Sequence, residues 1–89
     1  MNPLYDKFLN YIRCELNLSA HTVLSYTSDL RQWNAFCESL FGEDYDPAAV
    51  TANDMRMWVA HMSGQGVGAR SIRRKVQTLR AFFRYMMIR

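Results

Sequence analysis

Apolar side chains recur along this chain at steps of three and four residues, the spacing that places them on one face of an α-helix. Four segments have this pattern, over residues 3–16, 19–40, 52–63 and 69–88. No stretch alternates apolar and polar residues with the period of two that is typical of a strand. The sequence therefore predicts an all-α fold, in which four helices pack their apolar stripes around a shared core.

Each predicted helix has its own stripe of core residues. The stripe of 3–16 consists of Leu4, Phe8, Ile12 and Leu16, widened by Tyr5 and Leu9. The stripe of 19–40 consists of Val23, Tyr26, Leu30, Trp33, Cys37 and Leu40. The two later stripes consist of Met55, Trp58, Val59 and Met62, and of Ile72, Val76, Leu79, Phe83 and Met86.

Capping residues support these boundaries. Pro3 suits the first position of a helix, and Ser19 is a good N-cap because its hydroxyl can accept a bond from a free amide of the first turn. Thr51 and Asp54 have the spacing of a capping box. Residues 41–50, FGEDYDPAAV, combine a glycine, acids and a proline, which predicts a solvated loop.

Charge is distributed unevenly along the chain. Residues 1–54 hold all eight acids and three of the eleven bases, a net charge of −5, whereas residues 55–89 carry eight bases and no acid. Seven of the bases lie in the last twenty residues. The segment 69–88, which follows Gly66 and Gly68, places one set of polar side chains opposite its stripe: Arg70, Arg73, Arg74, Gln77, Arg80 and Arg84. Such a one-sign surface is the electrostatic signature of a polyanion partner, although a solvated basic face is the simpler interpretation of a single helix.

Composition narrows the function classes. The chain of 89 residues, 49% apolar and 13% aromatic, fits one folded domain. It has neither a signal peptide nor an apolar run long enough to span a bilayer, so a cytoplasmic location is expected. Cys14 and Cys37 are expected to be buried free thiols rather than a disulfide. No motif for catalysis, for a metal ion or for a cofactor is present, so none of these is expected.

Small polar residues gather at the start of the segment 19–40. His21 and Thr22 belong to its first turn, and Ser25 and Ser28 follow outside the apolar stripe. An imidazole and hydroxyls near a helix N-terminus suit phosphate oxygens, because free amides and the positive end of the helix dipole lie beside them. The residues alone leave open the other interpretation, that Ser19, His21 and Thr22 only cap the helix.

Two segments resemble a known family. The first, FLNYIRCELNLSAHTVLSYTSDLRQWNAF, is similar to the pattern of an apolar helix, L-S-x-H-T and Y-x-x-D-L found in the N-terminal core-binding domain of tyrosine recombinases, the Xer-like and phage-integrase group. The second, GQGVGARSIRRKVQTLRAFFRYM, resembles that family's last helix. Gly68 departs from the usual serine cap, Gln77 and Thr78 replace small residues, and Phe83 replaces a tyrosine.

The resemblance implies an orthogonal, SAM-like four-helix bundle that forms half of a clamp around duplex DNA. Its DNA-contacting residues would be His21, Thr22, Ser25, Ser28, Arg70, Ser71, Arg74, Lys75 and Thr78. It also implies that the catalytic groups lie in a further C-terminal domain, with a linker beginning near Arg89, so that residues 1–89 form a single DNA-binding domain unable to cut DNA. Sister recombinase protomers would be partners of the full-length protein.

The hypothesis from the sequence is therefore the DNA-binding domain of a site-specific recombinase or integrase. The alternative is a basic helical module that binds an acidic protein or a sister protomer, with no role for DNA. The two differ in the salt dependence expected for binding to duplex DNA, which is steep only for the first.

Overall fold

The computed structural model describes residues 1–88, and these contain four α-helices and no strand, which confirms the all-α prediction. The helices are α1 (Pro3–Asn10), α2 (Ala20–Phe41), α3 (Ala52–Gly64) and α4 (Ala69–Ile88). Two short elements were not predicted, a π-helical turn η1 (Tyr11–Glu15) that continues α1 and a 3-10 helix η2 (Pro47–Ala49) in the loop before α3. The position expected for a linker, Arg89, lies outside the described residues.

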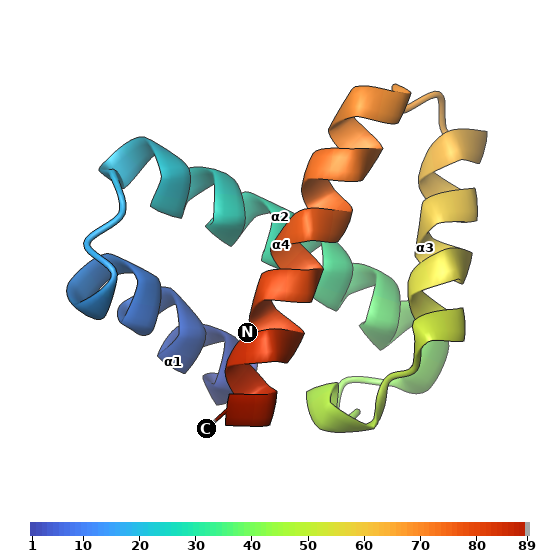
Figure 1. Ribbon diagram of the computed structural model, residues 1–89. Coiled ribbons are helices and arrows are strands. Elements are labelled where there is room, and N and C mark those ends of the chain that lie inside the picture. Colours follow the sequence, from blue (N-terminus) through green and yellow to red (C-terminus); the bar gives the residue numbers. More distant parts are fainter. Residues whose placement is uncertain (89) are drawn as a thin grey trace.

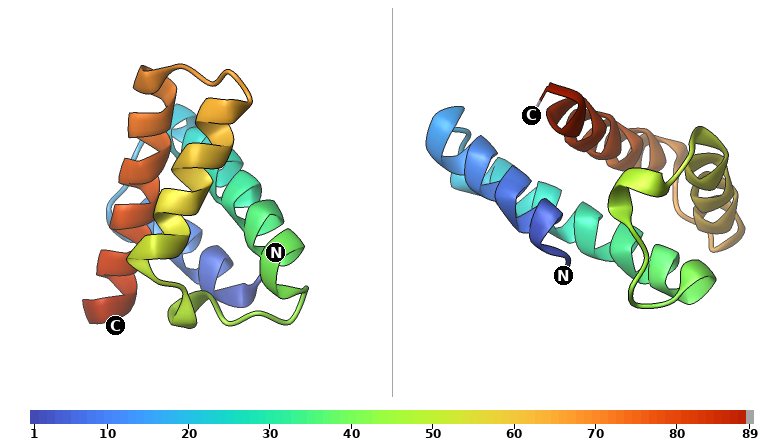
Figure 2. Two further views of the ribbon diagram at one scale, coloured as in Figure 1. Left: turned by 90° about the vertical axis from the view of Figure 1, so that its right-hand side faces the viewer. Right: turned by 90° about the horizontal axis from the view of Figure 1, so that it is seen from below.

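The long helix α4 is central to the arrangement. It contacts α1, α2 and α3, whereas α1 and α3 lie on its two sides (Figure 1). In Figure 1 α4 crosses in front of α2, and the side view in Figure 2 places α3 beside α4. The N-terminal ends of α2 and α4 diverge from this crossing, toward the left and the top of Figure 1.

The core collects residues from all four helices around α4. Its buried members are Tyr5, Phe8, Ile12, Leu30, Trp33, Cys37, Trp58, Met62, Leu79 and Phe82. Aromatic rings fill much of it in offset geometries, which suit their quadrupoles. Phe8 meets Phe82 edge-on at 5.6 Å between ring centroids, and Trp33 meets Trp58 at 5.3 Å.

The predicted caps are present. The Ser19 hydroxyl accepts a hydrogen bond from the Thr22 amide at 3.2 Å. Thr51 and Asp54 form the reciprocal capping box, in which the Thr51 hydroxyl accepts from the Asp54 amide and the Asp54 carboxylate accepts from the Thr51 amide. Pro3 occupies the first turn of α1, where its missing N–H costs nothing.

Several expected core positions are exposed instead. Leu16 is exposed because η1 holds more residues per turn than an α-helix, which is marked by the bond from the Leu16 amide to the Tyr11 carbonyl, and this rotates Leu16 off the stripe. Leu40 is exposed in the last turn of α2. Cys14, on η1, is also exposed, whereas Cys37 is buried as predicted, and both are free thiols.

The buried face of α4 differs from the predicted one. Among the predicted stripe residues only Leu79 is fully buried; Ile72, Val76, Phe83 and Met86 are partly buried. The fully enclosed face instead consists of Lys75, Thr78, Leu79 and Phe82. The apolar pattern missed this face because two of its four members are polar.

Candidate nucleic-acid interface

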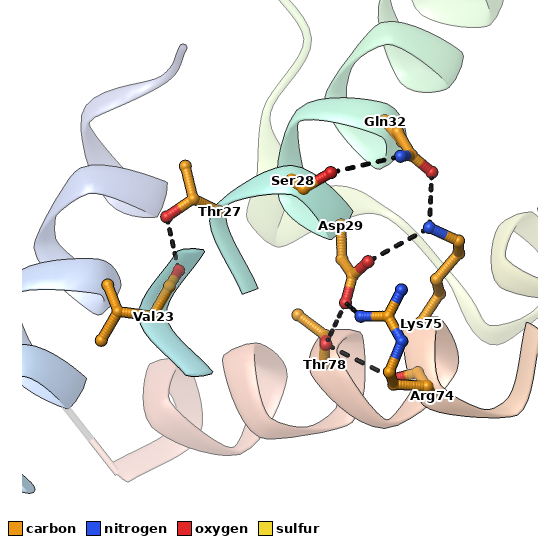
Figure 3. A network of polar contacts seen from close by, with 8 residues as sticks. All are labelled: Val23, Thr27, Ser28, Asp29, Gln32, Arg74, Lys75 and Thr78. Atoms are coloured by element: carbon orange, nitrogen blue, oxygen red, sulfur yellow. Dashed lines mark hydrogen bonds and ion pairs between the residues drawn. The ribbon is translucent and has the colours of Figure 1, made fainter. Parts of the chain in front are cut away.

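A buried carboxylate lies where α2 crosses α4. Asp29 of α2 has no exposed surface, and its side chain points at α4 (Figure 3). Its Oδ2 accepts hydrogen bonds from Arg74 at 2.7 Å and from the Thr78 hydroxyl at 2.8 Å, while its Oδ1 accepts from Lys75 Nζ at 3.2 Å. We call Asp29, Arg74, Lys75 and Thr78 the Asp29 cluster.

Two further side chains of α2 extend the Asp29 cluster toward the surface. Lys75 Nζ also donates to Gln32 Oε1 at 2.8 Å, and Gln32 Nε2 donates to Ser28 Oγ at 3.4 Å (Figure 3). The Lys75 ammonium therefore has two oxygen partners although the residue is only 8% exposed. A buried charge requires such pairing, because an isolated ion in the interior is very costly.

Helix periodicity explains why these residues meet. Asp29 follows Tyr26 by three residues and precedes Trp33 by four, so it lies on the buried face of α2. On α4, Lys75, Thr78, Leu79 and Phe82 are spaced by three, one and three residues, so they share one face. Asp29 of α2 then faces Lys75 and Thr78 of α4 where the two helices cross, beside the apolar core.

The predicted DNA-contacting residues of α2 lie at its N-terminal half, with different exposure. His21 and Ser28 are exposed, and Thr22 and Ser25 are partly buried. Thr22 is engaged with the N-cap, because its amide and hydroxyl both bond to the Ser19 hydroxyl. Ser19 and Thr22 thus take part in the cap of α2, while the bonds of that cap do not include His21 or Ser25.

The predicted residues of α4 fall into two groups. Arg70 and Ser71 are exposed, and the Arg74 side chain is 49% exposed although one of its nitrogens bonds Asp29. Lys75 and Thr78 are buried in the Asp29 cluster, so the structure does not support the expectation that these two side chains contact DNA directly. Their hydrogen-bonding atoms are directed at Asp29 and Gln32, away from solvent.

The arginines of α4 share one broad face. Taking about 100° per residue, Arg74 lies about 100° round the helix from Lys75 and bonds Asp29, and Arg70 lies about 140° from Lys75 in the same direction. Arg80 and Arg84 lie about 140° and 180° from Lys75 in the other direction. They line a groove between α3 and α4, together with Arg56 of α3. The arginines of α4 therefore span an arc of about 120°, from Arg74 beside Asp29 at one edge to Arg80 against α3 at the other.

The groups with shifted pKa values lie on α1, on α2 and in the loop before α3. Burial raises the pKa of the Tyr5 hydroxyl and of the Cys37 thiol to about 12 each. Burial also raises the pKa of Tyr45. The Tyr45 hydroxyl forms a hydrogen bond with the Tyr5 hydroxyl at 2.6 Å and donates to the Asn34 amide oxygen at 2.8 Å. These groups stay protonated at neutral pH and hold the loop before α3 against α1 and α2.

Residues 1–88 contain no group of three or more histidine, cysteine or acidic side chains placed to hold a metal ion. Within the same range, no helix has the length and apolar character needed to cross a membrane. The arrangement offers cations, hydroxyls and an imidazole at the surface, which are groups that can bind anions.

Comparison with known proteins assigns the family. Residues 5–89 match the model of the phage integrase N-terminal SAM-like domain. Tyrosine recombinase XerC of Staphylococcus aureus strain USA300 is 36% identical over 87 residues, and that of strain JH9 is 34% identical. Each alignment covers 98% of this chain but 28% of the relative. No solved structure matches the chain. Because the family match spans nearly the whole chain, the protein belongs to the N-terminal SAM-like domain family of phage integrases.

Proposed function

We propose that this chain is the DNA-binding domain of a site-specific tyrosine recombinase, and that it clamps duplex DNA at the recombination site through α2 and α4. The observation that carries the proposal is the half-exposed Arg74 of α4, which bonds Asp29 of α2 at the crossing, with the exposed Arg70 one turn before it. Arginines and hydroxyls are the groups that most often bind phosphate oxygens. The curated relatives are bacterial recombinases, whose DNA lies in the cytoplasm, so we place this domain there too.

The contact set that we propose is smaller than the sequence suggested. His21, Ser25 and Ser28 of α2 contact the DNA directly. Arg70, Ser71 and Arg74 do so from α4. Thr22 donates its amide to the Ser19 cap of α2, and Lys75 and Thr78 act through Asp29, which fixes the crossing of the two helices. Sister recombinase protomers are further partners of the full-length protein.

A salt titration tests the proposal. Two or three phosphate contacts give a slope of about −2 to −3 in log K against log salt, at about −0.9 per contact. Arg70→Ala should make this slope shallower by about one, because an exposed arginine that meets phosphate releases one counterion. Arg13→Ala, an exposed arginine of η1 on another part of the surface, is the matched control and should leave the slope unchanged.

Two outcomes would count against DNA binding. A slope near zero with duplex DNA would favour the alternative, a protein-interaction module without a DNA role. If Arg70→Ala and Arg13→Ala reduced the salt slope equally, the contact would be a diffuse charge effect and α4 would not be placed as proposed.

We also propose that this chain does not cleave DNA, because it matches only 28% of each XerC relative and the family resemblance implies that the catalytic groups lie in a further C-terminal domain. Incubation with a nicked suicide duplex should leave no covalent adduct on a denaturing gel. A tyrosine-linked DNA adduct would refute this part of the proposal.

A further inference from the structure

The side of α4 opposite the Asp29 cluster forms an apolar groove with α3. The groove has a volume of about 700 Å³, and its floor consists of Met55, Val59, Val76, Phe83 and Met87. Met87 is 87% exposed, so the end of the groove is open to solvent. Four of these side chains belong to the two predicted core stripes of residues 52–63 and 69–88, and they are only partly buried here.

Three arginines edge this groove, Arg56 from α3 and Arg80 and Arg84 from α4. Within residues 1–88, the ion pairs end on Asp29, and no carboxylate pairs with these three. DNA offers phosphates but no apolar side chains, so a phosphate backbone would leave the floor uncovered. A complementary partner has apolar side chains flanked by carboxylates.

This chain has such a segment on its own surface, where α2 ends. Leu40 and Phe41 are exposed in the last turn, at 42% and 49%, and Glu43 and Asp44 follow at once, both exposed. Gly42, with φ +93°, ends the helix and turns the acidic pair away from its axis. Apolar and acidic side chains are thus adjacent in this segment, which matches the apolar floor and the arginine edge of the groove.

The segment cannot reach the groove of its own chain. Tyr45 fixes the loop through its hydroxyl bonds to Tyr5 and Asn34, and its ring contacts Phe41 at 6.4 Å between centroids. The next element, η2, contributes Ala48 to a second hollow, which shares Met55, Phe83 and Met87 with the groove. The acidic segment is therefore held in one position and is available only to another molecule.

We propose that the groove between α3 and α4 binds the segment Leu40–Asp44 of a second copy of this chain. Leu40 and Phe41 cover the apolar floor, while Glu43 and Asp44 pair with the arginines of the edge. The contact is heterologous, because the groove and the segment are different surfaces. A molecule that uses its groove still has a free segment, and its neighbour still has a free groove, so further copies can bind. The groove is the size of a small-ligand pocket, so the contact is weak in isolation and weaker at high salt.

Sedimentation equilibrium can test this contact with variants in which the charges of the groove and of the segment are exchanged. The measurement is made without DNA, so its result does not depend on DNA binding. The wild-type domain should self-associate at low salt and about millimolar concentration. Arg80→Glu with Arg84→Glu should abolish association, and so should Glu43→Lys with Asp44→Lys. An equimolar mixture of the two double variants should associate again, because each groove then meets a segment of opposite charge.

The control is Arg13→Glu with Arg31→Glu, which changes the net charge as much as the groove variant but at exposed sites outside the groove. It should leave self-association within about twofold of wild type. Circular dichroism checks folding, and a charge-reversal variant that fails to fold is replaced by its glutamine counterpart, which should weaken association without rescue on mixing. Any of four results would overturn the proposal. The wild type could be monomeric, the groove variant could still associate, the mixture could stay monomeric, or the control could lose association.

Discussion

Replacing Asp29 by asparagine gives the sharpest test of how this fold is held together. The substitution keeps the shape of the side chain but removes its charge and turns one acceptor oxygen into an N–H₂ donor. That donor then faces either the Lys75 ammonium or the Arg74 guanidinium and the Thr78 hydroxyl, all of which donate to Asp29 now. Removing one partner of a buried ion pair costs about 3 to 5 kcal/mol, because the other charge stays buried.

Lys75 accounts for most of this expected cost. The Arg74 side chain is 49% exposed, so water can solvate it once Asp29 loses its charge. The Lys75 side chain is 10% exposed and would keep only Gln32 as an oxygen partner. In a domain of this size a loss of 3 kcal/mol lowers the melting temperature by about 12 °C or more.

Urea unfolding and thermal melting followed by circular dichroism measure the effect. Asp6→Asn, an exposed acid of α1, is the matched control and should change the stability by less than about 0.5 kcal/mol. Adding Lys75→Met to Asp29→Asn should recover at least about 1 kcal/mol, because the stranded charge is removed. The reasoning fails if Asp29→Asn behaves like the surface control, or if the costs of the two substitutions simply add.

Three further predictions concern the core and its titrating groups. Leu79→Ala should lower the unfolding free energy by about 2 to 5 kcal/mol in urea titrations, because Leu79 is fully buried, whereas Leu24→Ala at an exposed site should cost little; equal costs would contradict the observed core. Ellman's reagent should modify one thiol per native chain, Cys14, and two after denaturation, since Cys37 is buried and its pKa is raised to about 12; two reactive thiols in the native protein would be inconsistent with this. The unfolding free energy should stay level below pH about 9 and fall from there toward pH 12, because the unfolded chain releases the protons of Cys37 and Tyr5 while the native state, with pKa values of about 12, retains them; a flat profile to pH 11 would refute the shifts.

The helices were predictable because their signals are local. Ser19 and the pair Thr51 and Asp54 mark helix starts through bonds to amides two or three residues away, and those bonds are present. The face of α4 was harder to predict, since its burial depends on a residue 45 to 49 positions earlier. A usable signal did exist, because Asp29 is an acid placed on the apolar face of α2, and a buried acid requires a cationic partner.

The candidate site was predictable only in part for the same reason. Family resemblance supplied positions on α2 and α4, and it could not distinguish an arginine at the surface, such as Arg70, from a lysine in the interior, such as Lys75. Counting cations also does not show what each one packs against. Arg74 bonds Asp29 of α2, whereas Arg80 and Arg84 line the groove with α3, a difference that depends on how α2 and α3 pack.

The position of Leu79 and Phe82 in the core has a consequence for synthesis on the ribosome. Their partners Tyr5, Phe8 and Leu30 are made first, so the nascent chain holds an open apolar surface until nearly all of α4 has been translated. Because distant contacts close the core, α1, α2 and α3 cannot complete it by themselves. A chain released before Leu79 would thus expose that surface, as a substrate for chaperones and proteases rather than as a smaller folded domain.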